Sequence, residues 1–164
     1  MKKQKGFSLI ELLIVVAIIL IIAAIAIPNL LRARMAANEA SAAAAIRTLN
    51  TAEVSYQNKF NTTKGYAPTL VSLGPNGVAA PCVPDPAGVT GDCQIDSVLA
   101  SGTKGGYVYT YASAGGPPAV SYTVIATPIT PNQTGTRQFC SFEDAVVRGS
   151  TAVIAACTAA VLPL

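Results

Sequence analysis

The stretch that decides the fold is FSLIELLIVVAIILIIAAIAIPNLL at residues 7–31, in which leucine, isoleucine, valine and alanine dominate. As a helix, this run is long enough to span the roughly 30 Å hydrocarbon core of a bilayer. Three lysines precede it, a bias that orients the N-terminus of a membrane helix toward the cytoplasm. Arg32 and Arg34 on its far side oppose the bias more weakly. We therefore expect one membrane-spanning helix with a cytoplasmic N-terminus.

Three residues distinguish this run from an ordinary membrane anchor. Gly6 stands at its border, Glu11 lies inside it, and Pro28 lies near its outer end. A carboxylate at such a depth costs about 2.5–3.5 kcal/mol on insertion scales, and a proline removes a backbone donor and tends to kink a helix. A secretory signal has a shorter apolar region, of about 7–15 residues. Cleavage of such a signal after Ala24 or Ala26 is the alternative to a retained helix.

The sequence KGFSLIEL at residues 5–12 resembles the leader of type IV prepilins, and the resemblance is close from Gly6 to about Asn29, Pro28 included. In that family a membrane-embedded aspartyl peptidase cuts after the glycine on the cytoplasmic side and methylates the new N-terminal amine. The resemblance implies prepilin peptidase as a partner, cleavage between Gly6 and Phe7, and N-methylation of Phe7. It also implies that the mature chain keeps its apolar helix.

Glu11 has a natural counter-charge in the processed chain. Cleavage after Gly6 creates a cationic amine on Phe7, about one helical turn from Glu11. A carboxylate inside a membrane needs a partner, and the Phe7 amine of an adjacent subunit can supply one. Such a pair would set axial register, as a buried polar residue does in coiled coils. We therefore expect Glu11, together with Pro28, to act in assembly; an idiosyncratic acidic residue in a plain anchor is the alternative.

Helical composition continues beyond the apolar run. Residues 32–60 contain neither glycine nor proline, and the alanine-rich segment at 40–45 favours a helix. Apolar residues then recur at spacings of three and four, which places them on one helix face. They are Ile46, Leu49, Ala52, Tyr56 and Phe60. We expect this apolar stripe to pack against a sheet.

From residue 61 the composition changes to glycine, proline, serine and threonine, with β-rich runs at 107–111, 120–127 and 137–142. The expected fold class is α+β and pilin-like. One long N-terminal α-helix, with a transmembrane half and an amphipathic half, packs on an antiparallel sheet of three or four strands. The expected organisation is a leader at 1–6, the transmembrane half at 7–31, the amphipathic half at 32–60 and a β-rich head at 61–164, with a variable loop at 66–104 and a helical turn around 69–73.

The composition excludes several kinds of catalytic chemistry. The chain has no histidine, which removes Ser-His and Cys-His nucleophile pairs and most catalytic zinc sites. Asp85, Asp92 and Asp96 cluster in the long loop, without the ligand-dense, glycine-punctuated pattern of a calcium loop. We expect a non-enzymatic protein with no metal and no cofactor, calcium binding by these aspartates being the alternative. Without the leader lysines, eight basic residues balance eight acidic ones, so no nucleic-acid partner is firmly implied.

The cysteines indicate an oxidising compartment. All four follow the apolar helix, at Cys82, Cys93, Cys140 and Cys157. An even count in the exported part predicts two disulfides. Three pairings are possible, and we favour Cys82 with Cys93 and Cys140 with Cys157, because each bond closes a modest loop and stabilises it by about 3 kcal/mol. The second loop also resembles the C-terminal disulfide loop of many pilins.

The resemblance leads to three candidate functions. The first is a structural subunit of a type IV pilus, for adhesion, motility or DNA uptake. The second is a pseudopilin of a type II secretion system, and the third a membrane-anchored binding protein that never polymerises. Two expected disulfides and no evident calcium loop favour the pilus. The partners would be identical subunits, the inner membrane, prepilin peptidase, and an assembly platform with its ATPase. The chain would span the inner membrane once before assembly and form an extracellular or periplasmic filament afterwards.

Overall fold

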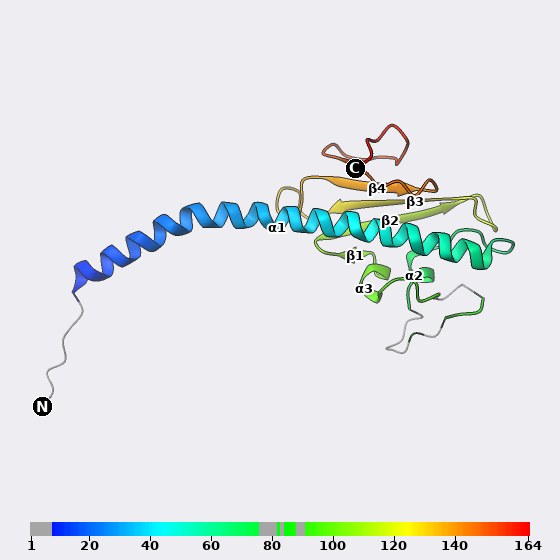
Figure 1. Cartoon of the computed structure of the whole chain (residues 1–164), viewed down its shortest axis with the longest axis horizontal. Helices are drawn as coiled ribbons and strands as arrows, with labels where there is room; N and C mark the ends of the chain where they lie inside the picture. The colour runs from blue at the N-terminus through cyan, green and yellow to red at the C-terminus, as the bar shows by residue number, and fades with distance from the viewer. Residues whose placement is uncertain (1–7, 76–81, 83, 88–90) are drawn as a thin grey trace, which may run out of the picture. The chain divides into compact units, whose positions relative to one another are not determined.

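The computed structural model describes residues 8–75, 82, 84–87 and 91–164. The chain divides into two compact units, residues 1–34 and residues 35–164, and each is described by itself. Helix α1 runs from Leu9 to Phe60 and contributes to both units (Figure 1). The second unit holds all the strands and the two shorter helices, and it is called the head below.

Helix α1 ends at the boundary that the sequence predicts. Pro28 lies inside the helix without ending it, and the last helical residue is Phe60. The Phe60 carbonyl oxygen then accepts hydrogen bonds from the N–H groups of Thr63, Lys64 and Gly65. At Gly65 the angle φ is +69°, and an added Cβ atom would lie 2.0 Å from the Ala119 carbonyl oxygen. Glycine is therefore the residue that this turn requires.

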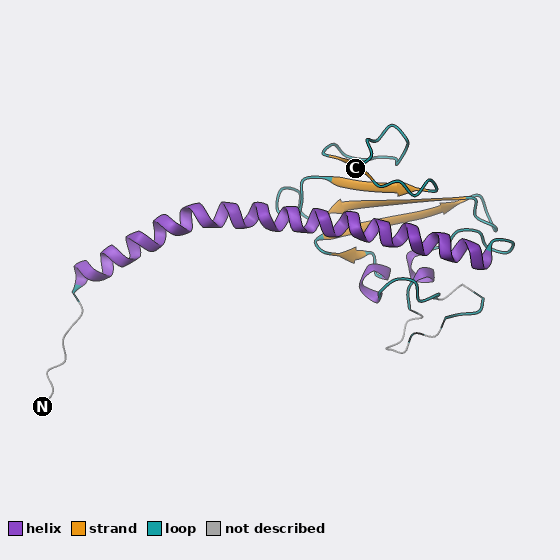
Figure 2. Cartoon of the chain, viewed as in Figure 1, coloured by secondary structure: helices purple, strands orange, loops and turns teal. Residues whose placement is uncertain are grey.

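The sheet contains five antiparallel strands, which pair in sequence order (Figure 2). Three or four were expected. The strands are β1 Thr103–Lys104, β2 Tyr107–Ala114, β3 Ser121–Pro128, β4 Gln138–Phe142 and β5 Arg148–Ser150. The three predicted β-rich runs correspond to β2, β3 and β4. The additional strands β1 and β5 are two and three residues long, too short to show an alternating pattern in the sequence.

The segment predicted as one long loop at 66–104 contains more structure than expected. The predicted helical turn is present as α2, Leu70–Leu73, whose N-terminus is capped by the Thr69 side chain. A second short helix, α3, spans Ser97–Ala100, and the Asp96 side chain caps it by accepting a hydrogen bond from the Leu99 N–H group. Short polar caps of this kind satisfy donors that a helix leaves unpaired.

The core of the head lies between the C-terminal half of α1 and the sheet. All five residues of the predicted apolar stripe on α1 are buried, so the prediction that this stripe packs against a sheet is confirmed. From the strands, alternate residues such as Tyr107, Tyr122 and Val124 point into the same cluster. Each large apolar side chain removed from water in this way contributes about 1.5–3 kcal/mol. The stripe therefore holds α1 and the sheet together.

Candidate processing and assembly site

Glu11 caps the start of helix α1 by accepting a hydrogen bond from the backbone of Ser8. Ser8 directly precedes the first helical residue, and its carbonyl oxygen accepts a hydrogen bond from the Leu12 N–H group at 3.3 Å. Oε2 of Glu11 accepts a hydrogen bond from the Ser8 N–H group at 2.9 Å, which is one of the two contacts of a capping box. A glutamate three residues after a serine cap makes this contact in many helices. The pattern Ser-x-x-Glu at 8–11 is a sequence signal for it, which our sequence reasoning missed.

The residues on either side of the expected cleavage point, Gly6 and Phe7, lie outside the described residues. The structure therefore describes the expected processing segment only from Ser8 onward. Glu11 is exposed in the first turn of α1. The Ser8 N–H group donates to Oε2 of Glu11. Because a carboxylate can accept more than one hydrogen bond, Glu11 can still accept one from a second donor.

The N-terminal part of α1 is apolar and exposed. Its large side chains are exposed by 79% at Leu9 and still by 43% at Leu31. The helix is long and apolar enough to cross a membrane, and none of its most apolar window is buried within the chain. Pro28 interrupts the helical hydrogen bonds here, because its nitrogen carries no proton for the carbonyl group four residues earlier. A surface of this size and composition requires a membrane or other apolar helices around it.

On the head, Glu39 fastens the connection between β3 and β4 to α1. Its Oε1 atom accepts hydrogen bonds from the Thr136 N–H and Oγ1–H groups, each at 2.8 Å, and from the Arg137 N–H group at 3.2 Å. The preceding residue on the helix, Asn38, donates its amide N–H to the Thr134 carbonyl oxygen at 2.9 Å. These two helix side chains fix the start of β4 relative to α1.

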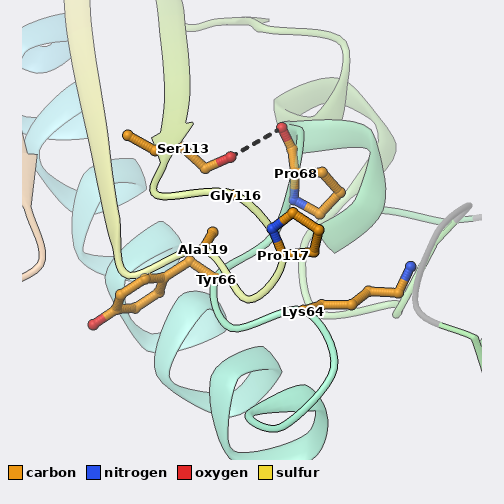
Figure 3. Close-up of a pocket in the computed structure, with 8 residues that line it drawn as sticks. Lys64, Tyr66, Pro68, Ser113, Gly116, Pro117 and Ala119 are labelled. Carbon is orange, nitrogen blue, oxygen red and sulfur yellow. Dashed lines mark hydrogen bonds between the residues drawn. The ribbon is translucent and has the colours of Figure 1, made fainter.

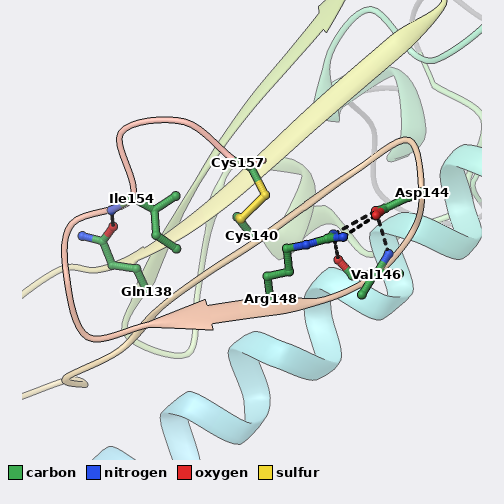
Figure 4. The surroundings of a disulfide bond; sticks show 7 residues. All are labelled: Gln138, Cys140, Asp144, Val146, Arg148, Ile154 and Cys157. Atoms are coloured by element: carbon green, nitrogen blue, oxygen red, sulfur yellow. Dashed lines mark hydrogen bonds and ion pairs between the residues drawn. A yellow bond between two sulfur atoms is a disulfide. The ribbon is translucent and has the colours of Figure 1, made fainter. Parts of the chain in front are cut away.

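Both disulfides have the pairing that we favoured. The structure links Cys82 to Cys93 and Cys140 to Cys157. Figure 4 shows the second bond between strand β4 and the C-terminal segment, with Ile154 donating its N–H group to Oε1 of Gln138 at 2.8 Å. Although Cys140 is fully buried, the segment carries exposed apolar side chains, with Val153 exposed by 82%. The bond therefore ties an apolar surface segment to the sheet.

The aspartates of the predicted loop do not converge on a metal site. Asp92 is buried and pairs with Lys59, while Asp96 pairs with Lys104, which lowers the pKa of the Asp96 carboxyl group. Asp85 accepts a hydrogen bond from the Ala87 N–H group. Within the part of the chain that the structure describes, no group of three metal-ligating side chains occurs. Each carboxylate thus has a local structural partner.

A pocket of about 280 Å³ opens beside the turn that follows α1 (Figure 3). Tyr66, Pro68 and Pro117 line it, and Lys64 lies at its edge. Ser113 donates its hydroxyl proton to the Pro68 carbonyl oxygen at 3.5 Å. The polar side chains of the lining are those of Lys64, Tyr66 and Ser113, and the Ser113 hydroxyl is engaged by the backbone at Pro68.

Comparison with known proteins first defines a class. Residues 1–27 match the family model described as a prokaryotic N-terminal methylation motif. The match includes Gly6, Phe7 and Glu11, the residues that the sequence analysis singled out. The N-terminal segment is therefore a prepilin-type motif, and the α+β architecture of a long helix packed on an antiparallel sheet accompanies it.

Two particular proteins are similar to part of the chain. It is 46% identical over 74 residues to the type IV wide pilus major component PilA4 of Thermus thermophilus. The aligned residues make up 45% of this chain and 56% of that protein. It is also 46% identical over 54 residues to the type IV major pilin protein PilA of Myxococcus xanthus. Here the aligned residues make up 33% of this chain and 24% of that protein. The chain thus spans about half the length of the first relative and about a quarter of the second. No solved structure matches it.

Proposed function

We propose that this chain is a structural subunit of a type IV pilus filament. The observation that carries the proposal is the methylation motif at residues 1–27 on an apolar, exposed helix with a single carboxylate in its first turn. The expected organisation becomes part of the proposal. A leader at 1–6 is removed, residues 7–31 form the transmembrane and assembly half of α1, residues 32–60 form the half that enters the head, and residues 61–164 complete the head.

Processing would change the charge at the start of the helix. Cleavage between Gly6 and Phe7 by prepilin peptidase removes three lysines and leaves one amine, on Phe7. N-methylation keeps that amine cationic. Because the Ser8 N–H group uses one oxygen of Glu11, the other oxygen is available for the amine of a neighbouring subunit. The Glu11 carboxylate can thus accept the hydrogen bond from Ser8 and pair with a neighbouring subunit at the same time.

The pairing would set the axial position of each subunit in the filament. A carboxylate in an apolar environment is costly unless it is paired, so a neighbour whose Phe7 amine does not reach Glu11 is disfavoured. The apolar side chains around it pack without directional preference. Glu11 therefore supplies the specificity, and the exposed apolar surface of residues 9–31 supplies the attraction between identical subunits.

Several features support a pilus over the alternatives. Both curated relatives are described as type IV pilus components, which favours a pilus over a secretion pseudopilus. A non-polymerising anchored protein has no use for a register-setting carboxylate. Two disulfides suit a head exposed to an oxidising compartment. The partners in this proposal are the inner membrane, prepilin peptidase and an assembly platform with its ATPase.

Mass spectrometry of sheared filaments from cells that produce this chain tests the proposal. We expect the filaments to contain a chain that begins at methylated Phe7 and has lost residues 1–6. The same cells carrying Gly6→Leu should retain the uncleaved chain in the membrane and produce no filaments. A mature chain that begins at Met1 or near residue 25, or the absence of this chain from sheared filaments, contradicts the proposal.

A further inference from the structure

Glu53 is a fully buried carboxyl group in the head, and the proposed role in a filament does not use it. Its side chain lies on α1, four residues after Leu49 on the buried face of the helix, with 0% exposure. Oε2 of Glu53 accepts a hydrogen bond from the Ala67 N–H group at 3.0 Å. Oε1 has no hydrogen-bond donor among the described residues. A buried ionised carboxylate with one oxygen unsatisfied is costly.

The Tyr111 hydroxyl group is the candidate partner for the unsatisfied oxygen of Glu53. Tyr111 on β2 is close enough to the Glu53 carboxyl group to interact with it. However, Tyr111 has a single hydroxyl proton, which it donates to the Ala67 carbonyl oxygen at 2.7 Å. The Tyr111 oxygen can therefore only accept a hydrogen bond from Glu53, and Glu53 can donate one only if it carries a proton.

We propose that Glu53 is retained as a carboxylic acid in the folded head and that its proton completes a ring of three hydrogen bonds, which opens when the group ionises. In this ring Glu53 donates to Tyr111, Tyr111 donates to the Ala67 carbonyl oxygen, and the Ala67 N–H group donates to Glu53. The ring joins α1, the connection that follows α1 and strand β2. It therefore acts as a pH-dependent fastening of the helix to the sheet.

The surroundings of Glu53 agree with a neutral carboxyl group. The titratable groups that face it are phenols: Tyr56 from α1, Tyr66 from the connection, Tyr111 from β2 and Tyr122 from β3. Charged groups act on these phenols from outside: Asp92, the partner of Lys59, acts on Tyr56, Glu143 on Tyr66, and Asp144, the partner of Arg148, on Tyr122. Burial raises the pKa of Glu53 from 4.5 to about 7, although the hydrogen bond from the Ala67 N–H group lowers it in part.

The pH range of the effect follows from this direction of shift. A carboxyl group whose pKa is higher in the folded state stabilises that state fully below its unfolded pKa, and the contribution is lost as the pH rises to the folded pKa. For Glu53 this range is from about 4.5 to about 7. The chain has no histidine, the side chain that usually titrates there, and all four cysteines are in disulfides.

The experiment compares the full-length chain in detergent micelles with its Glu53→Gln variant. Unfolding of the head is followed by the near-ultraviolet circular dichroism of its tyrosines between about pH 4.5 and about pH 8. A glutamine is neutral, can accept from the Ala67 N–H group and can donate to Tyr111. We expect the ratio of the two unfolding constants, wild type over variant, to rise about tenfold for each pH unit up to about pH 7 and then to level off.

Two further measurements isolate Glu53 from other causes. Glu143→Gln removes an exposed carboxyl group of the same head, and this variant should keep the pH dependence of the wild type. Infrared spectroscopy of the folded wild type near pH 6 should show the C=O stretching band of a protonated carboxylic acid. This band should be absent from Glu53→Gln, and its frequency should shift in Tyr111→Phe. The proposal is overturned if Glu53→Gln keeps the wild-type pH dependence, or if the folded wild type shows no such band.

Discussion

At the scale of single residues, Glu11 makes one contact within its own chain and has a second role in the proposed filament. Within one chain it caps the helix, because Oε2 accepts from the Ser8 N–H group. In the proposed filament its charge pairs with a neighbouring amine. In the proposed membrane-inserted subunit, the carboxylate of Glu11 would keep one hydrogen bond before assembly, because the Ser8 N–H group already donates to one of its oxygens. Substitutions that keep one function and remove the other can distinguish them.

We predict that Glu11→Gln and Glu11→Ala both abolish filaments, while only Glu11→Ala loosens the first turn of α1. Glutamine carries no charge but can still accept the hydrogen bond from the Ser8 N–H group, whereas alanine has neither the charge nor an acceptor. Both variants should insert in the membrane and mature normally. The measurements are sheared filament yield and amide hydrogen exchange at residues 8–12. Normal filaments from Glu11→Gln would refute the pairing mechanism.

A second residue-scale prediction concerns the turn after α1. Gly65→Ala and Gly116→Ala both place a side chain at positive φ, at +69° and +73°, but only the first would contact another atom within 4 Å. Positive φ costs about 1–2 kcal/mol for a residue with a Cβ atom. We expect Gly116→Ala to lower the free energy of unfolding by that amount and Gly65→Ala by clearly more. Chemical denaturation measures both, and equal losses would show that the contact with Ala119 is relieved at no cost.

At the scale of elements, the disulfide between Cys140 and Cys157 decides whether the C-terminal segment stays on the sheet. Beyond β5 this segment is held by few backbone contacts, among them the hydrogen bond from the Gly149 N–H group to the Leu162 carbonyl oxygen at 3.0 Å. We predict that Cys157→Ser lowers the free energy of unfolding by about 3 kcal/mol. The rate of amide hydrogen exchange should also rise at residues 151–164 before it rises in the rest of the head. Unchanged protection of this segment would show that its backbone contacts suffice.

The elements differ in how well the sequence predicts them, and for all except the short helix α2 the predicted elements are the longer ones. The apolar stripe on α1 repeats over four helical turns, so its period is unambiguous, and β2 and β3 each contain eight residues of alternating burial. Strands β1 and β5 and helix α3 have two to four residues, which is too few to display a period. Their positions are set by partners distant in the sequence.

The candidate site was predictable in part for a similar reason. The motif around Gly6 and Glu11 is a local pattern, and residues alone can identify it. The burial of Glu53 depends on tertiary structure, because Tyr111 and Ala67 come from other segments of the chain. One signal was nevertheless present: Glu53 lies four residues after Leu49, and hence on the same helix face as the apolar stripe. A charged residue on such a face is worth noting before the structure is known.

At the scale of the whole molecule, the division into two units predicts that the head folds without the apolar segment. Buried core residues begin at Ala42, so a chain that starts at Met35 retains all of them. We expect this chain to be soluble and monomeric without detergent, to unfold cooperatively and to form no filaments. Sedimentation and thermal unfolding test this, and an aggregated or unfolded product would show that residues 1–34 are needed for folding.

The sequential order of the sheet has a consequence for how the molecule is made. Each strand from β1 to β4 pairs with the next one along the chain, so strand pairing has low contact order, which favours fast folding. A polypeptide that crosses a membrane after its N-terminal anchor presents the stripe of α1 first and then one strand after another. Every arriving strand finds its neighbour already in place. If the chain is exported as proposed, the head can therefore fold strand by strand, and the Cys140–Cys157 disulfide can form only after residue 157 has emerged.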